Sequence, residues 1–266
     1  MDQPKGVTAR HPSASWHPSH LLVGFTDASS RRPTTMTAPS LLGRGIYTPR
    51  FASKLTKVNA QSITRWCTGG RKGQSKDSTQ NPVFASDFIA SDRQSLSFED
   101  LSEIYIISDF RKKGISLQTI RAAQRRARSI LGDNHPFSNS QFLTDGKSIL
   151  LEIEEPESDP ALIDLKNMQR SFQRVVRPYL SAVFDYSSQG SRPTQIHPSR
   201  QIHSVIMDPR RQFGQPILQE EGIPTSALYQ AFKVEKSEAA VAEWFGVSEE
   251  AVRKAVRFEL DLIAKM

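Results

Sequence analysis

The amino-acid sequence predicts a mainly helical protein with small β elements, an α+β fold, on the strength of three observations. Apolar residues recur at helical spacing across residues 97–131. Two segments, 44–74 and 238–256, fit the pattern of a helix-turn-helix, in which two short helices meet at a tight turn. Short strands are indicated by the run 141–153, which has an Asp-Gly pair in its middle, and by the run 202–207.

Size and composition limit the class of protein. The chain has 266 residues and a formal net charge of +7, which allows one large domain or two small ones and favours an acidic partner, with nucleic acid as the first candidate. Cys67 is the single cysteine, so no disulfide can form within the chain. The sequence contains no apolar run long enough for a membrane span and no secretory pattern at its start. We therefore expect a cytoplasmic protein that does not contact a membrane.

Changes in composition divide the chain into four parts. Residues 1–40 are rich in Ser, Pro, Thr and His and are expected to form a disordered tail. A first domain follows at 41–155, with a helical extension and the hairpin at its end. Residues 156–197 form a helical and linker segment, within which 186–195 has the composition of a linker. A second domain, 198–266, begins with a strand and continues with three helices.

Positive charge concentrates in residues 41–76, which carry eight Lys or Arg and no acidic residue. Two short helices fit this segment. The first begins at Thr48, a capping residue followed by proline, and the second covers about 59–67. Ser53 supplies the small side chain where the helices cross, and Lys57 stands at the turn, where glycine is common. We predict a DNA-binding helix-turn-helix, with a merely solvated basic helix pair as the alternative.

The residue types in this pair suit two kinds of DNA contact. Gln, Asn and Arg side chains can pair with base edges in the major groove, whereas Lys and Arg contacts to phosphates give affinity and salt dependence. The second helix would present Asn59, Gln61, Ser62, Thr64 and Arg65 to the bases. The phosphates would be bound by Arg50, Lys54, Arg71 and Lys72.

This segment resembles the MerR-type DNA-binding domain, and the resemblance continues beyond the helix pair. Residues 97–123 look like the segment that follows the wing in that family. The family's pattern there, basic residues, then Gly, then Ser-Leu, then Ile-Arg, is present as FRKKGISLQTIR at 110–121. The resemblance implies that 41–155 is a winged helix-turn-helix that binds double-stranded DNA. The long C-terminal coiled coil and clustered cysteines of the family's metal sensors are missing from the sequence, so metal sensing is not expected.

The second helix-turn-helix, at 238–256, follows the pattern more faithfully. Ala242 and Gly246 stand at the crossing and at the turn, with the same spacing as Ser53 and Lys57 in the first pair. Its second helix, however, opens with two glutamates after Ser248. Acidic side chains there favour the helix dipole but repel phosphates, so we predict a packing or protein-binding role for this pair in preference to DNA binding.

The surrounding residues resemble domain of unknown function 433, which occurs in many antitoxin-like proteins of bacteria. The matching residues are 207–209 (Met-Asp-Pro), 213–217 (Phe-Gly-Gln-Pro-Ile) and 222–225 (Gly-Ile-Pro-Thr), followed by the helix-turn-helix; the arginine usual in this pattern is missing. A MerR-like domain followed by a hairpin and this domain resembles the long antitoxin of VapBC-type modules.

That whole-chain resemblance implies a function and two partners. The protein would neutralise a PIN-domain ribonuclease toxin and repress the promoter that both genes share. Because helix-turn-helix proteins usually bind two-fold operators as pairs, we also expect a homodimer. The alternative is a stand-alone MerR-like transcriptional regulator without a toxin partner.

Enzyme chemistry finds little support in the sequence. No phosphate-binding, nucleophile-elbow or zinc-protease motif is present, and we expect no catalytic residue, no metal and no cofactor. His197 and His203 lie six residues apart, which is no standard metal-ligand spacing. The acidic run 152–164 is more typical of a solvated linker than of a metal site. Three arginines form a stripe along one face of a predicted helix: Arg121, Arg125 and Arg128. Two interpretations stay open for this stripe: it contacts DNA or the toxin, or it is simply a solvated helix face.

Overall fold

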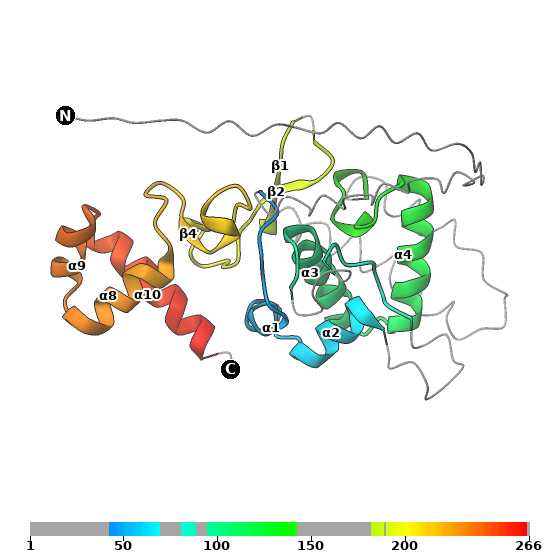
Figure 1. Ribbon diagram of the computed structural model, residues 1–266, viewed down its shortest axis with the longest axis horizontal. Coiled ribbons are helices and arrows are strands. Elements are labelled where there is room, and N and C mark those ends of the chain that lie inside the picture. The colour runs from blue at the N-terminus through cyan, green and yellow to red at the C-terminus, as the bar shows by residue number, and fades with distance from the viewer. Residues whose placement is uncertain (1–42, 70–80, 89–94, 143–181, 189, 265–266) are drawn as a thin grey trace, which may run out of the picture. The chain divides into compact units, whose positions relative to one another are not determined.

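A computed structural model of the chain describes residues 43–69, 81–88, 95–142, 182–188 and 190–264. These residues belong to one compact unit, Ser40–Met266. They are mainly helical with a few small antiparallel strands (Figure 1), which confirms the α+β fold class. The tail expected at 1–40 lies outside the described residues.

The basic segment forms two short helices whose limits follow from local capping. Helix α1 is Pro49–Thr56, and the Thr48 side chain accepts a hydrogen bond from the Phe51 amide. Helix α2 is Ala60–Thr68. Between them, Lys57 takes the left-handed conformation, with φ of 62°. Both predicted helix starts and the predicted turn position are therefore confirmed.

Replacing Lys57 with glycine should stabilise the protein. The left-handed conformation costs an ordinary residue about 1–2 kcal/mol. Glycine avoids this cost, but part of the gain is lost because glycine also increases the conformational freedom of the unfolded chain. We expect the free energy of unfolding in urea to rise by roughly 0.5 kcal/mol. Lys236 ends another helix with φ of 56°, so Lys236→Gly is a matched variant that should give a similar gain. Lower stability in both variants would contradict this explanation.

Helix α3, Phe98–Lys112, is the central element of the first domain. It packs against α1, against α4 (Leu117–Leu131), against the 3₁₀ turn η2 (Pro136–Ser138) and against strand β2 (Pro193–Ile196). The sequence suggested a single apolar face, but every residue from 100 to 110 is buried. Burial thus extends beyond the predicted apolar face, and two of the buried acidic residues, Asp100 and Glu103, accept hydrogen bonds inside the protein.

The segment predicted as a linker contains a β-hairpin instead. Strand β1, Phe184–Tyr186, pairs antiparallel with β2, Pro193–Ile196. Phe184 and Ile196 are buried opposite each other, and Pro193 is the first residue of β2. Residues 186–195 are therefore not simply a linker, and the expectation for that stretch is wrong.

The other predicted strands have mixed outcomes. Strand β3, Val205–Ile206, pairs with β4, Ile217–Leu218, and Met207 forms a bridge to Ile196 in the first hairpin. The strand predicted at 202–207 is thus present but shorter. The hairpin predicted at 141–153 falls almost entirely outside the described residues, and its first two residues, Gln141 and Phe142, lie in a helical turn.

Three helices complete the chain as the sequence predicted. They are α8 (Thr225–Glu235), α9 (Glu238–Phe245) and α10 (Glu249–Ile263), and each packs on the other two. Ser237 and Ser248 cap the last two through their side chains. Among the described helices, none has the length and apolarity that a membrane span requires.

Candidate nucleic-acid interface

The α1–α2 pair buries one side and exposes a polar one. Ile63, Trp66 and Cys67 of α2 are buried. In α1, Ala52 is fully buried, whereas Ser53, the small residue predicted at the crossing, is half-buried. Burying the apolar side of α2 fixes which residues of this short helix can reach a ligand.

The exposed side of α2 carries two of the predicted base-contacting residues. Gln61 and Arg65 are both exposed and lie one helical turn apart, so their side chains project from the same side. Ser62 is half-buried beside them. A side-chain amide and a guanidinium in this arrangement can form paired hydrogen bonds with base edges.

Two other predicted residues have structural roles. The Asn59 side-chain oxygen accepts a hydrogen bond from the Gln61 amide at 2.9 Å and so caps α2. The Thr64 hydroxyl donates to the Ala60 carbonyl at 3.0 Å. Because those atoms are engaged within the helix, the structure leaves Gln61, Ser62 and Arg65 as the better base-contacting candidates.

Basic residues surround the pair. Arg50 is exposed and Lys54 half-buried on α1, whereas Arg71 and Lys72 lie outside the described residues. Lys112, at the end of α3, was not among the predicted residues. Burial lowers its pKa, and the positive charges of Lys57 and Arg200 lower it further against the opposing effect of Asp109. Positive charge is therefore concentrated near the turn between α1 and α2.

The three arginines of the α4 stripe have different surroundings. Arg121 donates from Nε to the carbonyl oxygen of Asn81 at 3.0 Å, and burial together with Arg125 lowers its pKa. This hydrogen bond joins α4 to the 81–88 segment. Arg125 and Arg128 are exposed, so the two interpretations of the stripe stay open for them.

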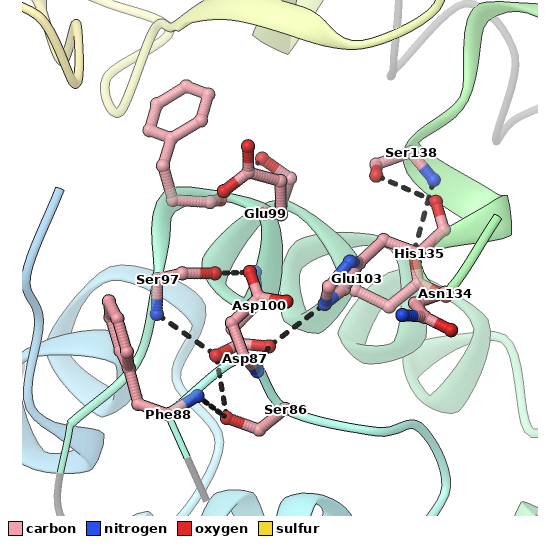
Figure 2. Close-up of polar contacts among 12 residues, drawn as sticks. Ser86, Asp87, Phe88, Ser97, Glu99, Asp100, Glu103, Asn134, His135 and Ser138 are labelled. Carbon is pink, nitrogen blue, oxygen red and sulfur yellow. Dashed lines mark hydrogen bonds and ion pairs between the residues drawn. The ribbon is translucent and has the colours of Figure 1, made fainter. Parts of the chain in front are cut away.

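The first domain also contains a buried polar cluster centred on Asp100 (Figure 2). The Asp100 carboxylate accepts hydrogen bonds from the Ser86 hydroxyl at 2.7 Å and from the Ser97 amide at 3.0 Å. It also contacts His135 Nε2 at 2.9 Å. Asp100 and His135 are both at most 2% exposed. This cluster joins the 81–88 segment to α3 and to the chain before η2.

Glu103 lies in the same interior and titrates unusually. Its carboxylate accepts hydrogen bonds from the amides of Phe137 and Ser138, at 3.4 and 3.1 Å. Burial raises the pKa of Glu103 to about 8, although His135 and the two amides oppose the rise. Burial lowers the pKa of His135, but Asp100 and Glu103 outweigh it and raise that pKa above its ordinary value.

Ligand atoms of Asp87, Asp100 and His135 lie within 4.8 Å of one another, close enough to share a metal ion. Both oxygens of Asp100 already accept hydrogen bonds, and His135 Nε2 is engaged with one of them. Asp87 forms an ion pair with Arg44 at 3.2 Å. A metal would have to displace these contacts, so the donor set fits a structural hydrogen-bond cluster better than a metal site. His135 had no distinguishing signal in the sequence, because its partners are distant along the chain.

Of the two histidines considered as ligands, His197 uses both ring nitrogens in hydrogen bonds, and His203 contributes its backbone carbonyl oxygen to one of them. His197 Nε2 contacts Asp185 at 2.8 Å, and its Nδ1 contacts the carbonyl oxygen of His203 at 3.2 Å. Their positions agree with the interpretation of ordinary hydrogen-bonded histidines.

The fold and the site together describe a mainly helical α+β protein with two short helix pairs, the first of them basic. No family model matches the chain. A protein of Mycobacterium tuberculosis named "Putative antitoxin VapB45" is 24% identical over 230 residues, which span 82% of this chain and 94% of that protein. The X-ray crystal structure of Rv2018 from Mycobacterium tuberculosis matches with a TM-score of 0.63 and 22% identity, over 79% of this chain and 96% of that one. The latter match shows a shared fold.

Proposed function

We propose that this chain is a DNA-binding antitoxin of a type II toxin-antitoxin module, not an enzyme. It neutralises a PIN-domain ribonuclease toxin and represses its own promoter. The observation that carries the DNA-binding part is the exposed Gln61–Arg65 pair on a short helix surrounded by basic residues. The antitoxin part is supported by the name of the similar protein from Mycobacterium tuberculosis.

In this proposal α1 and α2 form a MerR-like winged helix-turn-helix. Helix α2 enters the major groove of the operator, where Gln61, Ser62 and Arg65 contact bases. Arg50 and Lys54 bind phosphates on either side and set the affinity and its salt dependence. The Asn59 cap fixes the residue at which α2 begins.

The three helices at the C-terminus form the domain that contacts protein. Glu249 and Glu250 are exposed at the start of α10, where phosphates would be repelled. Trp244, on α9, is 75% exposed. Exposed tryptophans are frequent at the centres of protein interfaces, so a protein partner suits this surface better than DNA.

The deciding experiment is co-expression with the adjacent open reading frame, with an affinity tag on this protein only. A PIN-domain protein that co-purifies, and that inhibits growth when expressed alone, supports the antitoxin function. If nothing co-purifies and the neighbouring product is harmless, the antitoxin function is rejected. Specific binding to the promoter DNA would then favour the alternative, a stand-alone MerR-like transcriptional regulator.

We further expect a homodimer, because paired helix-turn-helix domains match the two-fold symmetry of most operators. Sedimentation equilibrium at micromolar concentration should give twice the chain mass of 29.8 kDa. A monomer under those conditions would count against two-fold operator binding.

A further inference from the structure

The residues directly before α1 contact a turn that lies far away in the sequence. The Tyr47 hydroxyl donates a hydrogen bond to the carbonyl oxygen of Gly214 at 3.0 Å, and the Ile46 amide donates to the carbonyl oxygen of Phe213 at 3.3 Å. Burial raises the pKa of Tyr47, so its hydroxyl keeps the proton that it donates. The first domain, which contains the helices proposed to contact DNA, is thus joined directly to the C-terminal domain.

Tyr47 is also fixed within its own domain. Its amide and carbonyl both bond to Leu96, at 2.9 and 2.8 Å. Its ring stacks on that of Phe51 in α1, with centroids 6.1 Å apart and planes inclined by 10°. The side chain is only 4% exposed. A displacement of Tyr47 would therefore be transmitted to α1 through Phe51.

The opposing turn is fitted closely to Tyr47. Gly214 has φ of 81°, and a Cβ there would collide with the Tyr47 hydroxyl and lie 3.3 Å from the Cα of Gly45. The preceding residues Gln212 and Phe213 also have positive φ, 47° and 54°. Such a conformation is rare for a bulky residue and persists only where the surroundings impose it.

From these contacts we propose that Tyr47 is a positioning residue that couples the C-terminal domain to DNA binding. The 212–214 turn holds Tyr47, Tyr47 holds Phe51, and α1 thereby sets the angle at which α2 is presented to the operator. A change in the C-terminal domain, such as partner binding, alters operator affinity through this contact. The coupling rests on the proposed DNA-binding function.

The test compares two tyrosine-to-phenylalanine variants of the full chain. Tyr47→Phe removes the hydrogen bond to Gly214 and keeps the stacked ring. Tyr186→Phe is the matched control, because the Tyr186 hydroxyl donates to the Ser138 carbonyl at 2.9 Å, away from α1. The probe is a duplex covering the promoter region upstream of the gene. Hydrogen exchange of the amides in residues 49–68 is measured in the same three proteins.

We expect Tyr47→Phe to weaken promoter binding about tenfold, within the usual range of coupling between sites, and to speed exchange in 49–68. Tyr186→Phe should change neither, although it loses a similar hydrogen bond. Equal affinity and equal exchange in the two variants would overturn the proposal. Wild-type protein that does not bind the promoter would refute the proposed function instead, and the exchange comparison would still decide whether Tyr47 positions the helix pair.

Discussion

Replacing Gln61 and Arg65 together by alanine is expected to weaken operator binding by about 2–4 kcal/mol, since each good bidentate contact to a base contributes about 1–3 kcal/mol. Both side chains are exposed on α2, so their removal leaves the buried side of the helix intact. Fluorescence anisotropy with a promoter duplex, at one fixed salt concentration, measures the change. Affinity for unrelated DNA should fall much less, because that binding depends on phosphate contacts.

A matched control tests whether the effect belongs to α2. Gln230 and Arg257 are the same residue types and are exposed on α8 and α10. Their double alanine variant should bind the operator as the wild type does. The thermal unfolding midpoints of both double variants should stay close to that of the wild type. Unchanged operator affinity after loss of Gln61 and Arg65 would show that α2 does not contact the bases.

The helix starts could be predicted because their causes are local. Thr48, Ser116 and Ser248 each accept a hydrogen bond from the amide three residues further on. A capping interaction of this kind depends on a few consecutive residues, so it is visible in the sequence. Lys57 was predicted at the turn for the same reason, although it is not the residue that the left-handed conformation favours.

The β1–β2 hairpin could not be predicted, because its cause is tertiary. Residues 186–195 have the composition of a linker. The pairing of the flanking segments is visible only in the structure, where Phe184 and Ile196 are buried opposite each other. The bridge from Ile196 to Met207 then joins this hairpin to β3. A pattern search along the chain finds strands by alternation over several residues, and these strands are too short to show it.

The candidate site was predictable in part for the same physical reasons. Gln61 and Arg65 follow from helical spacing, and the structure exposes both. The role of Asn59 as a cap depends on where α2 begins, to within one residue. The Asp100–His135 contact joins residues 35 positions apart, and no local pattern reports such a pair.

Stability of the protein should fall as the pH rises from 5 to 8, and the buried cluster supplies the reason. Burial raises the pKa of Glu103 to about 8 from an ordinary value of 4.5. Between those two values the unfolded chain releases the proton of Glu103 while the folded chain retains it, so the unfolded state becomes relatively more stable. At about 1.4 kcal/mol per pKa unit, the loss is on the order of 4 kcal/mol.

His135 acts in the same direction over a higher range. Its pKa is raised above the ordinary 6.5, because burial lowers it less than the hydrogen bond to Asp100 and the charge of that residue raise it. The stability that protonated His135 contributes is complete below pH 6.5 and is lost as the pH rises through the folded-state value. The free energy of unfolding, measured in urea at pH 5, 6.5 and 8, should therefore decrease at each step.

Glu103→Gln separates the two contributions. Glutamine cannot ionise, so the variant should lose most of the decrease between pH 5 and 6.5. Its NH2 group cannot accept the hydrogen bond of one of the two amides, and this loss lowers its stability similarly at all three pH values. Glu235→Gln, at an exposed position of α8, is the control and should follow the wild-type curve. Parallel curves for Glu103→Gln and the wild type would show that Glu103 is already ionised in the folded protein.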